Sequence, residues 1–188
     1  MLASLLLAAT LATPIWRVEL VAPQYPEGLG MEIRAHTIRG MREHDLDNMN
    51  ELNHYIGMKR IEPDSIRELR IIPWVIGALA AFGLVAALIG RRALVWAWLA
   101  AFAAGGVVGL VDFWRWEYDF GHNLDLEHAI IKVPGMTYQP PILGSKQLLN
   151  FTATSLPALG GWLAGAAFLL GVAALFLTRR RAHAAATA

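Results

Sequence analysis

The run "ALVWAWLAAFAAGGVVGLV" (residues 93–111) decides the fold, because no charged side chain interrupts it. A helix of roughly 20 mainly apolar residues crosses a bilayer core. Working outward, residues 71–90 on one side and residues 156–178 on the other meet the same criterion. The sequence therefore predicts membrane-spanning helices at 71–90, 93–112 and 156–178.

The first segment, "MLASLLLAATLATPIW" (residues 1–16), is apolar but shorter than the other three. It lacks the basic start of a signal peptide, although a loose small-residue pattern before Pro14 leaves cleavage as an alternative. We interpret it as an uncleaved first span. The predicted fold class is an α-helical integral membrane protein with four transmembrane helices and a small mixed α+β domain made of two inter-helix segments.

The composition supports a membrane protein and excludes several other classes. The chain has 188 residues, of which 56% are hydrophobic and 16% charged, and its mean hydropathy is +0.43. A net charge of +1 gives no field that would attract nucleic acid, so no nucleic-acid partner is expected. The absence of cysteine excludes disulfides, thiolate metal sites and lipidation at a cysteine.

The arginines predict the orientation in the membrane, since short loops rich in Lys and Arg stay in the cytoplasm. Arg91 and Arg92 fill the tight turn at 91–92, and three further arginines open the tail at 179–188. Both termini are therefore predicted to be cytoplasmic. Residues 17–70 and 113–155 would lie on the other side of a bacterial inner membrane, in the periplasm.

The first outer segment alternates apolar and polar residues in "WRVELVAP" (16–23) and "MEIRAHTIRG" (31–40), with Pro and Gly between them, which predicts a hairpin. "DLDNMNELNHYIG" (45–57) has a helical apolar stripe, and Gly57 is a candidate stop. The second outer segment ends in "IIKVPGMTYQPPILGSKQLLNF" (130–151), which we interpret as an extended loop rich in proline.

The distribution of His and Met is the main chemical signal. His54 and Met58 are four residues apart, so they share a face if the helix continues, whereas Met58 starts a loop if Gly57 ends it. Imidazole and thioether donors without a thiolate suit Cu(I) better than zinc, calcium or magnesium. The three strong spans contain no His or Met. The outer segments contain His36, His44, His54, His122, His128, Met31, Met41, Met49, Met58 and Met136.

Other chemistries have weaker support. Glu117 and its acidic neighbours could form a carboxylate pair, but acids beside a span end are usually solvated or paired with arginines. The chain has no nucleophile elbow, phosphate-binding glycine loop, HExxH or EF-hand pattern. We therefore predict that the protein is not an enzyme and that it does not hold a transmembrane bis-histidine haem.

Four strings carry a resemblance to a known family: "PIWRVELVAPQYPEGLGMEI", "NELNHYIGMKRIE", "VDFWRWEYDFGHNLD" and "IKVPGMTYQPPILGSKQLLNF". Together they resemble small four-span bacterial membrane proteins associated with nitrous oxide reductase maturation, commonly labelled accessory proteins or copper chaperones. The resemblance implies a role in denitrification. It also implies Cu(I) binding at four positions that match these strings, namely His54, Met58, His122 and Met136.

Two functions from different classes follow. The first is a membrane accessory protein that binds Cu(I) and delivers it to a periplasmic copper enzyme such as nitrous oxide reductase. The alternative is a non-catalytic docking subunit of a respiratory or photosynthetic membrane complex, with Tyr and Trp as anchors. A quinol-reactive enzyme using His122 and Glu117 ranks third, because it rests on residue types alone.

Overall fold

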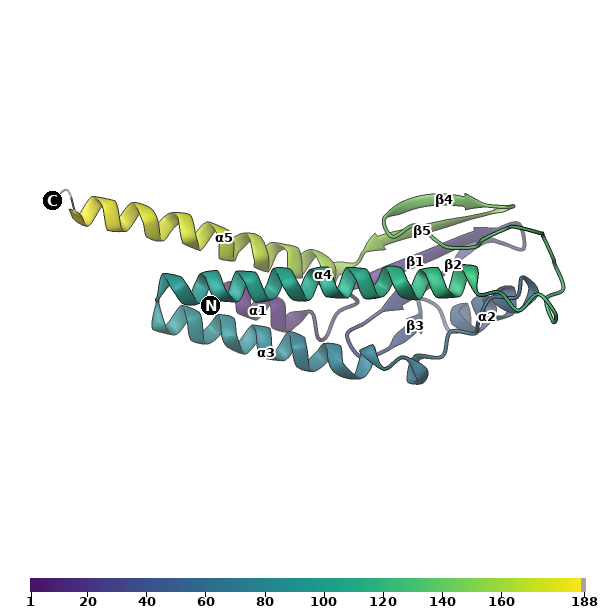
Figure 1. Cartoon of the computed structure of the whole chain (residues 1–188), viewed down its shortest axis with the longest axis horizontal. Coiled ribbons are helices and arrows are strands. Elements are labelled where there is room, and N and C mark those ends of the chain that lie inside the picture. Colours follow the sequence, from purple (N-terminus) through teal and green to yellow (C-terminus); the bar gives the residue numbers. More distant parts are fainter. Residues whose placement is uncertain (187–188) are drawn as a thin grey trace.

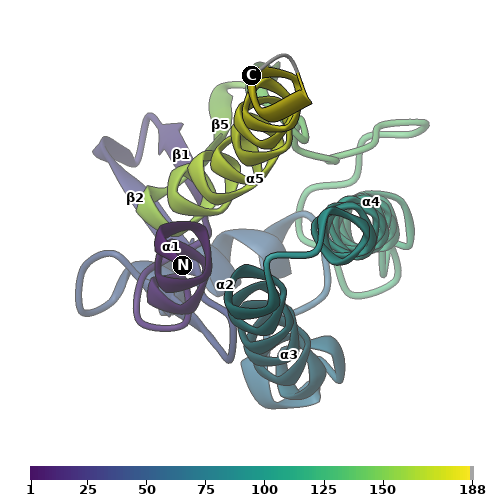
Figure 2. The same ribbon diagram turned by 90° about the vertical axis from the view of Figure 1, so that its left-hand side faces the viewer.

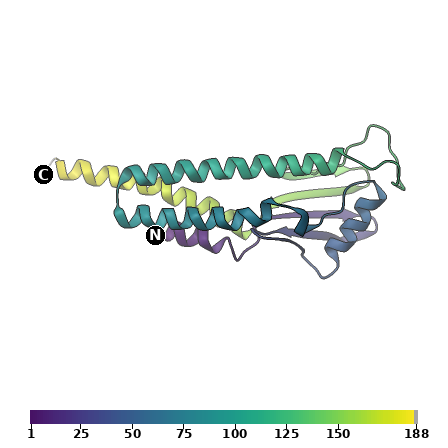
Figure 3. The same ribbon diagram turned by 60° about the horizontal axis from the view of Figure 1, so that its bottom comes forward.

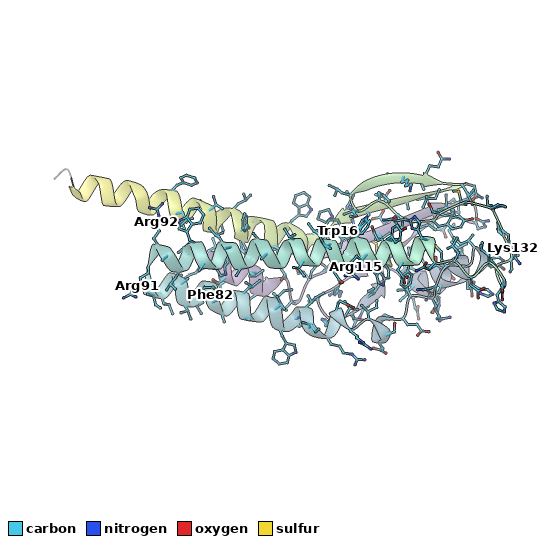
Figure 4. All side chains as sticks on the ribbon, in the orientation of Figure 1. Trp16, Phe82, Arg91, Arg92, Arg115 and Lys132 are labelled. Carbon is cyan, nitrogen blue, oxygen red and sulfur yellow. The ribbon has the colours of Figure 1, made fainter. Side chains whose placement is uncertain are left out.

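The protein is elongated, with a helical bundle at one end and a β-sheet domain at the other (Figure 1). The computed structural model describes residues 1–186, with side chains described for residues 1–176. Arg91 and Arg92 lie at the end of the bundle, and Lys132 lies at the opposite end of the molecule (Figure 4). The predicted tail, residues 179–188, lies outside the residues whose side chains are described.

Within the described residues, three helices are long and apolar enough to cross a membrane, so the prediction of four spans is wrong. They are α3 (Glu68–Ile89), α4 (Arg92–His122) and the part of α5 (Leu159–Ala186) that extends to Phe176. The prediction also understated the sheet, which has five strands built from both outer segments. The correct description is three candidate spans joined to a substantial antiparallel sheet domain.

The predicted first span, residues 1–16, contains only a short helix, α1 (Leu2–Ala9). Its 8 residues rise about 12 Å, which is less than half of a bilayer core. The chain then turns at Thr10, whose hydroxyl donates to the Leu7 carbonyl at 2.6 Å, and strand β1 already begins at Trp16. The predicted cytoplasmic N-terminus rested on this span and loses that support.

Helix α1 lies beside α3 and α5, as the view along the bundle shows (Figure 2). Leu7 of α1 joins a buried cluster with Trp98 and Leu99 of α4. The Trp98 indole N–H donates to the Leu79 carbonyl of α3 at 2.8 Å, and there is no room for a Cβ at Gly83 beside the same ring. Trp98 therefore holds the helices together where small residues allow close approach.

The sheet is antiparallel throughout, with strand order β3-β2-β1-β5-β4. The predicted hairpin is present, although its turn is shorter than expected, because β2 already begins at Tyr25. The segment predicted as an extended loop contains β4 and the start of β5. The strands are β1 (Trp16–Ala22), β2 (Tyr25–Ile33), β3 (Ile38–Gly40), β4 (Gly144–Leu148) and β5 (Phe151–Pro157).

One face of the sheet is buried and the other is polar, as alternation along β1 predicts. Val18 is buried on the inner face, whereas Arg17 and Glu19 form an ion pair at 3.5 Å on the outer face. Helix α2 (Asp45–Tyr55) contributes Met49 to the inner core. The last turns of α4 contribute Phe113, Trp116 and Phe120 to the same core.

Helix α4 serves both the bundle and the sheet domain. It has 31 residues, about 46 Å at 1.5 Å per residue, whereas a bilayer core is about 30 Å thick. Charged side chains begin at Asp112, and from Phe113 onward the helix packs on the core of the sheet. Figure 3 shows it continuing unbroken from the bundle alongside the strands. Residues 113–122 therefore belong to the sheet domain.

Asn50 joins α2 to the segment that leads into α3. Its amide donates to the Ile61 carbonyl at 3.1 Å and its side-chain oxygen accepts from the Ile61 N–H at 2.7 Å, and the pair is buried. Asn50→Ala leaves two buried backbone groups unpaired, so we expect a loss of about 2 kcal/mol in the free energy of unfolding. Denaturant titration in detergent measures this loss.

Asn53→Ala is the matched control for Asn50→Ala. It lies on the same helix, and its amide makes one exposed bond, to the Lys59 carbonyl at 3.3 Å. A change of less than about 0.5 kcal/mol is expected for it. Equal losses for the two variants would contradict a special role for Asn50.

Candidate functional site

The end of the sheet domain farthest from the spans contains a cavity of about 420 Å³, here called the outer cavity. Its walls come from the end of α2, the chain that follows it, and the loop after α4. The lining residues are His54, Gly57, Met58, Lys59, Arg60, Glu62, Asn123, Asp125, His128 and Ala129.

Gly57 determines how these two segments meet. Its φ of +77° lies in the left-handed region that favours glycine, and a Cβ there would lie 2.6 Å from the Asp125 carbonyl oxygen. The Gly57 carbonyl accepts from the Asp125 N–H at 2.7 Å, and the Tyr55 carbonyl accepts from the Ile131 N–H at 2.8 Å. The glycine that ends the helix thus also lets the second outer segment dock on it.

His54 and Met58 line this cavity together, although they do not share a helix. Helix α2 ends at Tyr55, and the Met58 N–H donates back to the Asn53 carbonyl at 2.8 Å. Of the two alternatives left by the sequence, Met58 therefore belongs to the loop after the helix. The His54 side chain is exposed and Met58 is half-buried.

His128 joins them from the second outer segment. Its Nδ1–H donates to the Asp125 carboxylate at 2.8 Å, so in the neutral form of the ring Nε2 carries the lone pair. Asp125 also accepts from the backbone N–H groups of Glu127 and His128, each at 3.2 Å. The hydrogen bonds from His128 hold the pKa of Asp125 below its ordinary value, so this carboxylate is ionised at neutral pH.

His122 and Met136 do not line the outer cavity. The His122 ring stacks on Tyr118 with a centroid separation of 3.9 Å, and its Nδ1–H donates to the Tyr118 carbonyl at 3.0 Å. Met136 is half-buried in the loop between α4 and β4, where its N–H donates to the Val133 carbonyl at 3.1 Å. The structure therefore groups His54 and Met58 with His128, and their convergence with His122 and Met136 stays a prediction.

The cationic residues of the outer cavity are paired. Lys59 lies 2.5 Å from Asp119 of α4, and Arg60 lies 3.6 Å from Asp47 of α2. Hydrogen bonds from Lys59 and then Asn123 lower the pKa of Asp119, so the first ion pair persists at neutral pH. These pairs offset positive charge beside the histidines and tie α4 to the chain after α2.

The lining of this cavity offers imidazole and thioether donors beside the carboxylates of Glu62 and Asp125. Two imidazoles and one thioether are ligands that suit Cu(I). Within the described part of the chain, no group of three or more His, Cys, Asp and Glu side chains is arranged to hold a metal.

Sequence reasoning missed His128 and Asp125 as members of this site. Asp and His three residues apart in "DLEH" are a local signal for a histidine oriented by a carboxylate. The approach of this loop to Gly57 has no such signal, because it depends on a contact between two distant segments.

Comparison with models of known protein families gives no match, and comparison with curated proteins finds no similar sequence.

Proposed function

We propose that the protein is a membrane-anchored accessory protein that binds Cu(I) in the outer cavity through His54, Met58 and His128 and passes it to a copper enzyme. The observation that carries the proposal is that these three side chains, from two segments far apart in sequence, line one cavity. The resemblance to proteins associated with nitrous oxide reductase maturation supports the same role.

Exposure and chemistry favour transfer over permanent storage. His54 and His128 are exposed, so a partner can reach the ion. A thioether and two imidazoles bind Cu(I) without the affinity of a thiolate cluster, which suits an ion that must be released. Asp125 acts as a positioning residue that fixes the His128 tautomer and ring orientation.

The proposed location is the bacterial inner membrane. Arg91 and Arg92 lie at the end of the bundle opposite the sheet domain (Figure 4). By the positive-inside rule this end, with the C-terminal tail, faces the cytoplasm. The sheet domain and the outer cavity then face the periplasm, where copper enzymes are loaded.

The first experiment is titration of the detergent-solubilised protein with Cu(I) against a chromogenic chelator under reducing conditions. The triple variant His54→Ala, Met58→Ala, His128→Ala is expected to lose competition with the chelator. The matched control, His36→Ala, His44→Ala, Met41→Ala, removes the same side-chain types from exposed positions and should compete like the wild type. Equal competition by both triple variants would overturn the assignment.

Two further variants refine the ligand set. Asp125→Asn is expected to weaken Cu(I) binding about 10- to 100-fold, because His128 loses its orienting carboxylate. A double variant, His122→Ala, Met136→Ala, tests the sequence prediction that these residues converge on the same ion. No loss of affinity in the double variant would limit the site to the outer cavity.

A further inference from the structure

A second cavity, here called the inner cavity, lies between the buried face of the sheet, α2, the end of α4 and the loop that follows α4. Its volume is about 430 Å³, within the range of small-molecule sites. Its walls are mostly apolar, and exposed lining residues such as Gln24 and Tyr55 show that it reaches the surface. Met58 lines both cavities, so the two adjoin there.

Three polar side chains that line the inner cavity have buried atoms without a hydrogen-bond partner. They are the indole N–H of Trp116, both carboxyl oxygens of Glu117 and the hydroxyl of Tyr138. Glu117 is 1% exposed and Tyr138 is 2% exposed. Folded proteins pair nearly all such groups, and leaving one unpaired costs free energy. Three of them around one apolar cavity point to a ligand.

The backbone holds two of these groups in place. Glu117 lies on α4, which packs on the sheet. The Tyr138 N–H donates to the Gly121 carbonyl of α4 at 2.9 Å. A Cβ at Gly121 would overlap the Gln139 backbone, so glycine is what lets the loop carrying Tyr138 approach the helix. The two side chains are positioned by contacts that do not involve their own polar atoms.

The donor and acceptor types define the complementary ligand. An indole N–H only donates, and a phenol and a protonated carboxyl both donate. Burial raises the pKa of Glu117 to about 7, so a large share of the carboxyl groups keep their proton at pH 7. The group that satisfies these donors is a hydrogen-bond acceptor, and the apolar walls favour an uncharged body.

We propose that the inner cavity binds an uncharged, mostly apolar molecule that presents a carbonyl oxygen to Trp116, Glu117 and Tyr138. The three polar groups differ from the proposed copper ligands, although Met58 lines both cavities. A small quinone has this chemistry, with an apolar ring system and acceptor oxygens at its edge. Because the chain contains no cysteine, a quinone cannot be trapped by thiol addition, and bound quinone reports on the cavity itself.

The test measures the binding of three probes of similar shape to the whole chain in lipid nanodiscs. Nanodiscs without the protein are the blank. The probes are 2-methyl-1,4-naphthoquinone, 2-methylnaphthalene, which lacks the carbonyls, and 2-naphthylmethylammonium, which replaces them with a cation. Equilibrium dialysis measures binding of each. The quinone is expected to bind about 10-fold or more tightly than the hydrocarbon, since each satisfied donor adds a few-fold.

Two variants identify the donors. Tyr138→Phe and Glu117→Leu are each expected to weaken quinone binding about 5- to 10-fold while leaving hydrocarbon binding within about 2-fold. Tyr55→Phe is the matched control, because it removes the same oxygen from an exposed tyrosine of the cavity wall, and it should bind like the wild type. Circular dichroism checks that each variant is folded.

Three results would overturn the proposal. They are equal binding of quinone and hydrocarbon, tighter binding of the ammonium probe, or unchanged quinone binding in Tyr138→Phe. Because Tyr138→Phe removes a single oxygen, it decides the question even if Glu117→Leu alters the fold. The Cu(I) titration of the outer-cavity variants is a separate readout, so failure of one proposal does not decide the other.

Discussion

Gly57→Ala is expected to lower the free energy of unfolding by about 2 to 4 kcal/mol. Two effects combine at this position. The φ of +77° is unfavourable for a residue with a Cβ, and the added methyl would lie 2.6 Å from the Asp125 carbonyl oxygen. Relief of the second contact requires movement of the loop that carries His128, so Cu(I) binding should weaken in the same variant.

Gly135→Ala separates these two effects. Gly135 has a φ of +74°, but a Cβ there would meet no atom within 4 Å. Gly135→Ala should therefore lower the free energy of unfolding only by the backbone strain, about 1 kcal/mol. Its Cu(I) binding should stay unchanged. Denaturant unfolding and chelator competition measure both quantities. Equal destabilisation by the two variants would show that the contact between Gly57 and Asp125 contributes nothing.

The second large effect is a pH dependence caused by Glu117. Its carboxyl is buried without a partner, and burial raises its pKa from 4.5 to about 7. The folded protein therefore holds this proton more tightly than the unfolded chain. Its stability is highest below pH 4.5 with respect to this group, falls between pH 4.5 and about 7, and stays low above that.

Glu117→Gln removes this penalty, so at pH 8 the variant should be more stable than the wild type by about 3 kcal/mol. Below pH 4.5 the two should unfold alike, because both side chains are then mostly neutral in the folded and the unfolded states. Thermal unfolding at a series of pH values measures the difference. Glu51→Gln is the control, since Glu51 is an exposed carboxyl on the same cavity. A pH-independent effect of Glu117→Gln would rule out desolvation as the cause.

Hydropathy was sufficient for the three long helices but not for their ends or for the first segment. In residues 1–16 an apolar composition suggested a span, yet the helix stops at Ala9 and Trp16 pairs with both Ile33 and Pro157 in the sheet. Pairing of residues so distant in sequence leaves no local pattern. The charges after residue 111 predicted the end of a span there, whereas α4 continues as one helix to His122.

The candidate site was predicted in part for the same reason. His54 and Met58 are close in sequence, so their relation was visible. Their approach to His128 depends on backbone contacts of Gly57 with Asp125, and the meeting of Glu117 with Tyr138 depends on Gly121. Gly57 was recognised only as a candidate helix stop and Gly121 was not singled out, because each contact arises only when a second segment packs on the glycine.

The unbroken α4 also sets how far the two cavities stand from the lipid. Residues 112–122 extend the helix about 16 Å beyond Val111, the last residue of the uncharged run. The headgroup layer on each side of a bilayer is about 5 to 8 Å thick. On the other side, β5 ends at Pro157 and α5 begins at Leu159, with the Gly160 N–H bonded to the Pro14 carbonyl at 2.7 Å. These two short junctions join the candidate spans to the sheet domain, so under the proposed topology the outer cavity lies beyond the headgroups. A soluble partner can then dock there without displacing lipid. A partner embedded in the bilayer needs a segment that extends above the headgroups to contact the cavity.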